Sequence, residues 1–245
     1  MQQYGLIGYP LGHSFSKRFF TEKFENEQID AIFESYPIDS IQKFSELIAA
    51  VKLNGLNVTI PYKEQVIPFL DELDENAAEI GAVNVIKFIR NENSLRLKGF
   101  NTDAIGFENS LRPYLQPHHT KALILGTGGA SKAIKFVLQK LGFAVLFVSR
   151  SSADGRLTYN ALNKQIIDEF TLIVNASPVG TFPNIDECPA IPYQFLSNKH
   201  LLFDVVYNPA ETLFLKKGRE YGAVGLNGEQ MLVEQAVAAW EIWNK

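Results

Sequence analysis

Residues 123–133 read LILGTGGASKA, and this stretch decides the fold of the second half of the chain. An apolar strand runs into a loop with Gly126, Gly128 and Gly129, and a helical pattern follows. This order is typical of a Rossmann-like unit, in which backbone N–H groups and the helix dipole receive a diphosphate. Ser131 replaces the third glycine of the G-x-G-x-x-G pattern, so a glycine-rich turn without a ligand is the alternative interpretation.

The rest of the chain alternates apolar strands with helical patterns, which indicates an α/β protein. We expect strands at residues 3–8, 31–36, 55–59, 83–89, 94–100, 121–125, 144–148, 171–174, 201–206 and 223–227, and helices at 16–26, 41–51, 129–141, 211–221 and 228–240. The two strands between residues 83 and 100 are expected to pair antiparallel at a sheet edge. The segment from Tyr114 to Thr120 has Pro117 and no periodicity, so it separates two lobes. The strands of the second lobe are nearly all apolar, as in a parallel sheet buried on both faces.

The residues after the second strand of this unit choose between NAD and NADP. An NAD enzyme places Asp or Glu there, about 20 residues after the glycines, to bind the ribose 2′-hydroxyl. This chain has Ser149, Arg150 and Ser151 instead. A guanidinium and two hydroxyls bind a 2′-phosphate through charge-assisted hydrogen bonds, so the sequence favours NADP. The alternative is that Arg150 is a solvated residue at a strand end.

The composition excludes several classes of protein. The 245 residues are 46% hydrophobic and 20% charged, which is ordinary for a globular protein and excludes disorder, collagen and disulfide scaffolds. The formal charge is -4, and no basic run offers a surface for nucleic acid or anionic lipid. The single Cys188, a start without a signal-peptide pattern and the lack of a long apolar run predict a cytoplasmic protein with no membrane partner. The histidines show no ligand spacing with one another or with Cys188, so no metal site is predicted.

Four segments of the first lobe carry polar groups that a core would not require: GHSFS (12–16), NVTIPYK (57–63), GAVN (81–84) and GFNTD (99–103). Each adjoins a predicted strand, so their side chains are expected to converge at one edge of a sheet facing the nucleotide lobe. Each also has a purely structural alternative: Ser14 and Ser16 as helix caps, Asn84 as a turn residue, and Asp103 as the N-cap of the following helix.

Lys63 is the most informative residue of these segments. Pro61 suits the first turn of a helix, so Lys63 would lie near a helix N-terminus, where the dipole disfavours a cation. Such a lysine loses its proton more easily and can relay a proton to or from an alcohol if a carboxylate such as Asp103 holds it. The alternative is an exposed, solvated lysine, the usual state of this residue type.

Nine ordered segments together resemble the shikimate dehydrogenase family nearly end to end. They are GYPLGHSFS (8–16), GLNVTIPYK (55–63), GAVNV (81–85), GFNTDAIG (99–106), GTGGASKA (126–133), SR (149–150), NASPVG (175–180), DVVYNPAETLFL (204–215) and GEQMLVEQA (228–236). The resemblance implies reversible reduction of 3-dehydroshikimate to shikimate with NADPH, a step toward chorismate and the aromatic amino acids. It also implies an α/β substrate-binding domain and a Rossmann-like NADP-binding domain with a parallel sheet, with a cleft between them.

The resemblance also carries the family's site residues over, position by position. Lys63 and Asp103 match the catalytic pair. The positions that bind substrate are matched by Ser14, Ser16, Thr59, Asn84, Tyr207 and Gln235. The cofactor positions are matched by Gly126, Gly128, Gly129 and Ala130 in the diphosphate loop, by Ser149, Arg150 and Ser151 at the 2′-phosphate, and by Asn175, Ser177 and Gly228. Because Gln235 comes from the last helix, the substrate domain is expected to be discontinuous, with residues 1–101 and 228–245 flanking a cofactor domain at 102–227.

Some positions depart from the family pattern. The family commonly has Pro after the second serine and a His-Asn pair soon after it, whereas this chain has Lys17, Phe20 and Thr21. Two alternatives to the implied activity stay open. One is a broader quinate/shikimate dehydrogenase or a paralogue for a related cyclic hydroxy acid, and the other is a non-catalytic NADP-binding sensor. In either case we expect a monomer or homodimer.

Overall fold

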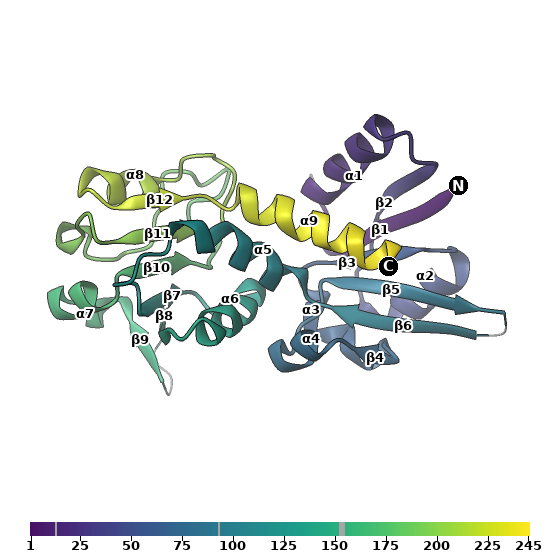
Figure 1. Ribbon diagram of the computed structural model, residues 1–245, viewed down its shortest axis with the longest axis horizontal. Coiled ribbons are helices and arrows are strands. Elements are labelled where there is room, and N and C mark those ends of the chain that lie inside the picture. Colours follow the sequence, from purple (N-terminus) through teal and green to yellow (C-terminus); the bar gives the residue numbers. More distant parts are fainter. Residues whose placement is uncertain (13, 93, 152–154) are drawn as a thin grey trace. The chain divides into compact units, whose positions relative to one another are not determined.

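The computed structural model describes residues 1–12, 14–92, 94–151 and 155–245 (Figure 1). His13 of the first polar segment lies outside these residues. The chain divides into two compact units, residues 1–106 with 233–245 and residues 107–232. Both boundaries between the units lie a few residues after those expected from the sequence, because each falls within a helix. These helices are α5 (Thr102–Leu111) and α9 (Glu229–Asn244).

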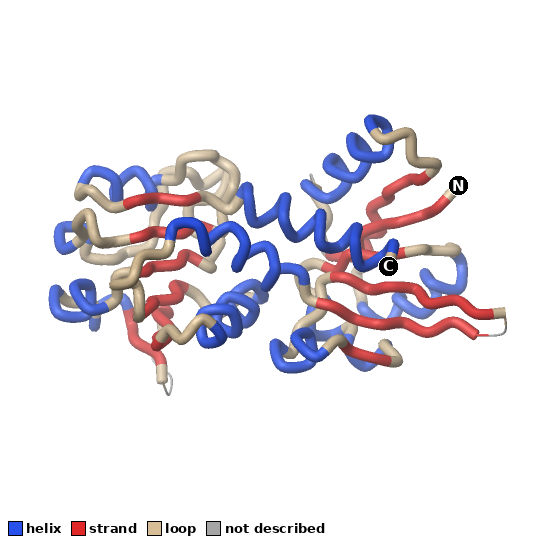
Figure 2. Tube along the Cα trace, in the orientation of Figure 1, coloured by secondary structure: helices blue, strands red, loops and turns tan. Residues whose placement is uncertain are grey.

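The first unit has a mixed sheet that contains six strands within the described residues (Figure 2). The strands are β1 (Gln2–Gly8), β2 (Ala31–Pro37), β3 (Gly55–Val58), β4 (Glu72–Leu73), β5 (Val85–Asn91) and β6 (Ser94–Phe100), in the order β2-β1-β3-β5-β6-β4. β1 is parallel to β2 and β3, whereas β5 is antiparallel to β3 and β6. The expected β5–β6 hairpin is therefore confirmed, but its expected place at the sheet edge is wrong. The short β4 pairs with β6 and forms that edge. The sequence could not predict β4, because a strand of two residues is too short to show an alternating pattern.

Helices cover both faces of this sheet. They are α1 (Phe15–Asn26), α2 (Phe44–Ala50), α3 (Tyr62–Gln65), α4 (Glu75–Ile80) and α9, with 3-10 turns η1 (Ile41–Lys43) and η2 (Ile67–Phe69). On one face α1 and α9 bury Phe20 and Trp243 against Tyr4 of β1, and α2, α3 and α4 cover the other face. The indole Nε1 of Trp243 donates to the carbonyl of Ile86 at 3.1 Å. A Cβ at Gly55 would lie 2.4 Å from that nitrogen, so the close approach of α9 requires glycine there.

The second unit has a sheet of six strands within the described residues, and every neighbouring pair is parallel. The strands are β7 (Lys121–Leu125), β8 (Ala144–Ser149), β9 (Arg156–Thr158), β10 (Leu172–Asn175), β11 (Leu201–Asp204) and β12 (Val224–Leu226), in the order β12-β11-β10-β7-β8-β9. The connecting elements are α6 (Gly129–Lys140), α7 (Lys164–Glu169) and α8 (Leu213–Glu220), with turns η3 (Arg112–Tyr114), η4 (Tyr159–Ala161) and η5 (Tyr193–Phe195).

This strand order is that of a doubly wound dinucleotide-binding sheet, with its switch point between β7 and β10. The expected α/β class, with a Rossmann-like second unit, is confirmed. No helix among the described residues is both long and apolar enough to span a membrane.

Candidate functional site

The strand directions of the first sheet bring its polar segments to one end. β1 and β3 run parallel, so the segments that follow them begin side by side. β5 runs the opposite way, so Asn84 before it lies at that same end, beside the residues that follow β6. Backbone hydrogen bonds join the segments, from Val58 N to Asn84 O at 2.8 Å and from Asn84 N to Phe100 O at 3.0 Å.

Lys63 and Asp103 form an ion pair at this end of the sheet. Lys63 lies in α3, directly after β3, and Asp103 lies in the first turn of α5, directly after β6. Lys63 Nζ is 2.5 Å from Asp103 Oδ2, and the two side chains are 15% and 11% exposed. An exposed, solvated lysine is therefore the wrong description of Lys63. A charged pair this sheltered from water holds a defined geometry.

The Asn84 side chain also fixes the Asp103 carboxylate. Asn84 Nδ2 donates to Asp103 Oδ1 at 2.9 Å, and Asn84 Oδ1 accepts from the backbone N–H of Thr102 at 2.7 Å. Asn84 is therefore more than a turn residue. The alternative that Asp103 is the N-cap of α5 is wrong, because Asn101 Oδ1 accepts from Ala104 N and takes that place.

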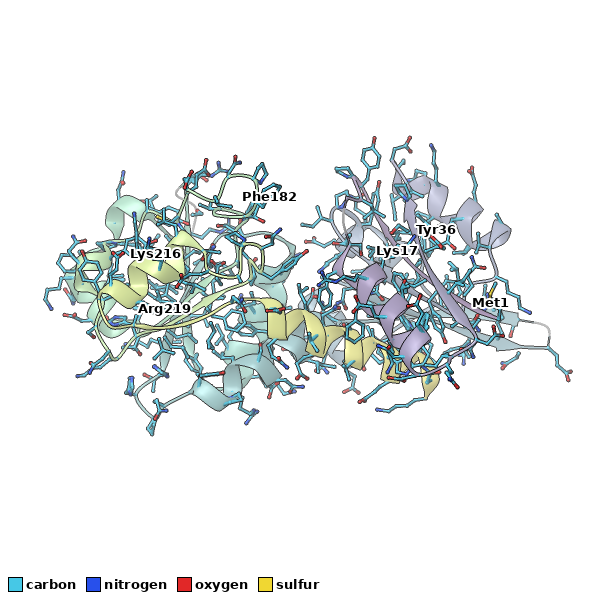
Figure 3. All side chains as sticks on the ribbon, turned by 90° about the horizontal axis from the view of Figure 1, so that it is seen from above. Met1, Lys17, Tyr36, Phe182, Lys216 and Arg219 are labelled. Atoms are coloured by element: carbon cyan, nitrogen blue, oxygen red, sulfur yellow. The ribbon has the colours of Figure 1, made fainter. Side chains whose placement is uncertain are left out.

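The start of α1 adds two hydroxyl groups. Ser14 is the N-cap, and its Oγ accepts from Lys17 N at 3.2 Å, as the cap interpretation predicts. A hydroxyl that accepts still has a proton to donate, so the cap leaves Ser14 able to bind a ligand. Ser16 is not the cap, and its Oγ accepts from Asn57 Nδ2 at 3.4 Å. Lys17 (Figure 3) stands where the family commonly has proline, and its Nζ lies 2.7 Å from Glu34 Oε2 of β2.

Asn57 is a candidate site residue that the sequence reasoning missed. It lies in β3, is 3% exposed, and its Oδ1 has no hydrogen-bond partner among the described residues. A buried acceptor left unpaired costs about 1–3 kcal/mol, so one beside Ser16 indicates a place for a ligand's donor group. The signal in the sequence was a single amide inside the otherwise apolar strand GLNV.

The remaining predicted substrate residues belong to different units. Thr59 follows β3 and is half-buried, and a Cβ at Gly8 would meet its Cγ2 at 2.5 Å. Gln235 is buried in the part of α9 that belongs to the first unit. Tyr207 follows β11 in the second unit and is 38% exposed.

A cavity of about 470 Å³ lies at the carboxyl ends of the second unit's strands. Its lining includes the predicted cofactor residues Gly126, Gly128, Ser149, Arg150 and Ser177. Further lining residues that the sequence reasoning did not single out are Thr127, Tyr159, Ala176, Pro178, Val179, Cys188, Pro189 and Ala190. The half-buried Tyr159 reaches the cavity from η4, and burial raises its pKa while the nearby Arg150 opposes this.

The glycine loop fits a diphosphate. Gly126 has φ +101°, and a Cβ on it would lie 3.0 Å from Ser177 Cβ, so a side chain there would close the gap between the two loops. Gly128 caps α6 without a side-chain hydrogen bond, so the helix end has no side-chain anion of its own. Backbone donors at a helix start favour an anionic group.

Other predicted cofactor residues lie beside the cavity lining rather than in it. Gly129 and Ala130 form the first turn of α6, and the carbonyl of Ser151 accepts from Ser149 Oγ at 2.5 Å. Asn175 is fully buried behind Ser177. Gly228 is also buried, and a Cβ on it would lie 2.3 Å from the carbonyl oxygen of Val205.

The comparisons with known proteins agree with one another. Residues 6–86 match the family described as the shikimate dehydrogenase substrate binding domain. The chain is 37% identical to the shikimate dehydrogenase (NADP(+)) of Halothermothrix orenii, over 99% of this chain and 90% of the relative. This chain belongs to the shikimate dehydrogenase family.

Solved members of the shikimate dehydrogenase family have the same fold. The crystal structure of the Aquifex aeolicus shikimate dehydrogenase matches with a TM-score of 0.86 and 35% identity, over 99% of this chain and 91% of that chain. A shikimate 5-dehydrogenase from Thermus thermophilus, solved in complex with NADP(H) and shikimate, matches with a TM-score of 0.85 and 28% identity, over 99% and 93% of the two chains. The resemblance drawn from the sequence motifs is confirmed.

Among the described residues, no group of three or more His, Cys, Asp or Glu side chains could hold a metal ion.

Proposed function

We propose that this protein is an NADP-dependent shikimate dehydrogenase that interconverts 3-dehydroshikimate and shikimate. The observation that carries the proposal is the Lys63–Asp103 pair, held by Asn84, in a chain that belongs to this family. A non-catalytic NADP-binding sensor has no need of a proton relay, so the sheltered pair supports an enzyme over a sensor.

The proposed cofactor site is the cavity of the second unit. Backbone N–H groups of Gly126, Gly128, Gly129 and Ala130 would face the diphosphate, and Ser149, Arg150 and Ser151 the 2′-phosphate. Asn175, Ser177 and Gly228 would shape the loops beside them. The Arg150 guanidinium in the cavity lining supports NADP, since the described residues that line the cavity include no carboxylate to bind a 2′-hydroxyl.

NADPH, when bound there, would supply the hydride that reduces the C3 carbonyl of 3-dehydroshikimate. Lys63 Nζ donates a proton to the carbonyl oxygen as it becomes the alcohol, and the neutral amine then regains a proton from water. Asp103 accepts a hydrogen bond from Nζ and so directs another N–H of the ammonium toward that oxygen. In the reverse direction Lys63 accepts the proton of the shikimate hydroxyl.

Substrate binding is proposed for the polar groups that match the family's substrate positions. The hydroxyls of Ser14, Ser16 and Thr59 would bind the substrate carboxylate. Asn84, Gln235 and Tyr207 would contact the ring hydroxyls or the carboxylate. Hydroxyl groups suit this role because each can donate a hydrogen bond to a carboxylate oxygen.

The deciding experiment follows NADPH absorbance with purified protein, shikimate and NADP, and repeats the assay with NAD and with quinate. Rapid NADPH formation from shikimate alone is the expected result. Comparable kcat/KM for quinate would favour the broader quinate/shikimate enzyme. If no pair of substrates turns over while NADP still binds, the protein is a sensor or a paralogue.

We also propose that the enzyme acts in the cytoplasm as a monomer or homodimer. A single cysteine supports a reducing compartment.

A further inference from the structure

A buried carboxylate lies behind the cavity of the second unit and has no part in the roles assigned above. Asp204 ends β11 and is fully buried. Its Oδ1 accepts from Asn175 Nδ2 at 2.9 Å and from Val206 N at 3.1 Å, and its Oδ2 accepts from Thr212 Oγ1 at 2.6 Å. Burial raises the pKa of Asp204 to about 6, while the three donors oppose that rise. At neutral pH the group is therefore a buried carboxylate ion, and its hydrogen bonds offset the free-energy cost of removing that charge from water.

Asp204 fixes the orientation of the Asn175 amide. Because Asn175 Nδ2 points at the carboxylate, its Oδ1 faces the other way and accepts from Ser177 N at 3.1 Å and Ser177 Oγ at 2.6 Å. Asn175 Nδ2 also reaches the carbonyl of Val179 at 3.3 Å. An amide turned end for end would set its NH₂ group against the Ser177 N–H. The carboxylate thus determines how the loop from Ser177 to Val179 is held.

This loop forms one wall of the cofactor cavity and touches the glycine loop. Ser177, Pro178 and Val179 line the cavity, and Ser177 packs so closely that a Cβ at Gly126 would lie 3.0 Å from its Cβ. A shift of Ser177 would therefore change the space for the diphosphate.

The loop after β11 is tied to the same wall. Val206 N donates to Asp204, and the backbone N–H of Phe182 donates to the carbonyl of Asn208 at 3.0 Å. Figure 3 shows Phe182 on the loop that follows β10. The two loops at the carboxyl ends of β10 and β11 are thus joined through one buried ion and its partners.

We propose that Asp204 is a positioning residue of the cofactor site, which holds the Ser177–Val179 wall through Asn175 in the conformation that receives NADP(H). The inference rests on the proposed function for the identity of the dinucleotide. Asp204 is fully buried and does not line the cavity, so it is assigned no direct contact with cofactor or substrate.

The test is the dissociation constant for NADPH, measured by the fluorescence of the bound cofactor. Asp204→Ala leaves three donors without an acceptor, and we expect Kd to rise on the order of tenfold. Asp204→Asn keeps an oxygen for Asn175 and Val206 and turns its NH₂ group to the Thr212 hydroxyl, so Kd is expected to stay within about threefold of wild type. KM for NADPH should follow Kd, whereas kcat and KM for 3-dehydroshikimate at saturating NADPH should change little.

A second variant pair covers the case in which Asp204→Ala does not fold. Thr212→Val removes the donor to Asp204 Oδ2 and should raise Kd by about threefold, and Thr212→Ser should restore it. Asn163→Ala is the matched control, because Asn163 caps α7 through Ile166 N, away from the cavity, and its loss should lower stability alone.

An unchanged Kd in folded Asp204→Ala, or in Thr212→Val where the alanine variant does not fold, would overturn the inference. So would an equal rise in the Asn163→Ala control. Because NADPH binding is measured without turnover, a wild type that binds NADPH but does not oxidise shikimate counts against the proposed function and leaves this inference standing.

Discussion

At the scale of single residues, the proposed chemistry depends on charges held in fixed places. Lys63 and Asp103 are both largely sheltered, and Asn84 binds the carboxylate oxygen that Lys63 does not use. Arg150 lines the cavity with Ser149 at the end of β8. These groups act through geometry, so removing one should change a specific kinetic constant rather than stability alone.

Replacement of Lys63 by alanine should lower kcat by about 10² to 10⁴, because it removes the proton donor, with a far smaller change in KM for shikimate. Steady-state kinetics of the NADP reaction measure both constants. Lys98→Ala is the matched control, since Lys98 also pairs with a carboxylate, that of Glu72, on the same sheet away from the site. A loss of tenfold or less in Lys63→Ala would contradict the assignment.

Replacement of Arg150 by alanine should raise KM for NADPH by at least about tenfold and leave KM for NADH unchanged, because only NADPH loses a charge-assisted hydrogen bond. The measurement is the ratio of kcat/KM for the two cofactors. Arg112→Ala serves as control, since Arg112 pairs with Glu108 on the surface of the same unit. An unaltered preference for NADPH in Arg150→Ala would rule out the 2′-phosphate role.

At the scale of elements, His118 and His119 join two loops of the second unit. Both residues lie before β7, and both contact the backbone of Lys199, which lies before β11. His119 Nδ1 accepts from Gln116 N at 2.9 Å, and its Nε2 reaches the carbonyl of Lys199 at 3.1 Å. His118 Nε2 reaches that same carbonyl at 2.9 Å. Because a backbone N–H already points at Nδ1 of His119, a second ring proton would have no acceptor there.

This arrangement predicts a loss of stability in acid. Burial lowers the pKa of His119 from its ordinary 6.5, with His118 and His200 adding to the effect and the Lys199 carbonyl opposing it. A lowered folded pKa means that the His119 contribution is complete above about pH 6.5 and falls as the pH drops below it, since the unfolded chain takes up the proton first.

Comparison of wild type with His119→Gln isolates this contribution. Urea unfolding from about pH 7.5 to about pH 5.5 should show a smaller acid loss in the variant. The comparison is needed because Asp204 changes stability with pH in the opposite direction. Its folded pKa of about 6 lies above the ordinary 3.8. Its contribution to stability is therefore complete below pH 3.8 and is lost as the pH rises through about 6. Equal acid losses in the two proteins would refute the role of His119.

At the scale of the whole molecule, the carboxyl-terminal helix completes the core of the amino-terminal unit. The ring of Trp243 lies 4.9 Å from that of Tyr4 and 5.1 Å from that of Phe20, centroid to centroid. Figure 1 shows α9 beside β1 and α1 although the chain between them contains the entire second unit. The first unit therefore cannot complete its core until the last residues of the chain are in place.

Trp243→Ala should destabilise the protein by about 3–5 kcal/mol, because it leaves a cavity in this aromatic core and the Ile86 carbonyl without its donor. Chemical unfolding measures the loss. Val237→Ala on the same helix is the control, since Val237 is exposed and should change stability by about 0.5 kcal/mol or less. A loss that small in Trp243→Ala would show that α9 is not part of this core.

The sequence predicted the elements whose signals are local. The strands at 31–36 and 144–148 follow from runs of apolar residues, and the glycine loop follows from its place between a strand and a helix. The helix expected at 41–51 is a 3-10 turn followed by α2, since Ser40 caps the turn at Gln42 N. Lys63 and Asp103 were found because the motifs around them resemble a known family.

What the sequence determined by itself is the α/β class, the dinucleotide loop, the family and the catalytic candidates, because each depends on residues that are neighbours in the chain. Only the tertiary structure decided that β4 takes the sheet edge, and that Asn57 Oδ1 has no hydrogen-bond partner among the described residues. It also decided that Tyr159 lines the cavity of the second unit and that Asp204 binds Asn175 next to the cavity lining. These features depend on side chains from distant segments meeting in a dry interior. Hydrogen-bond partners and burial there are set by packing, which leaves no pattern along the chain.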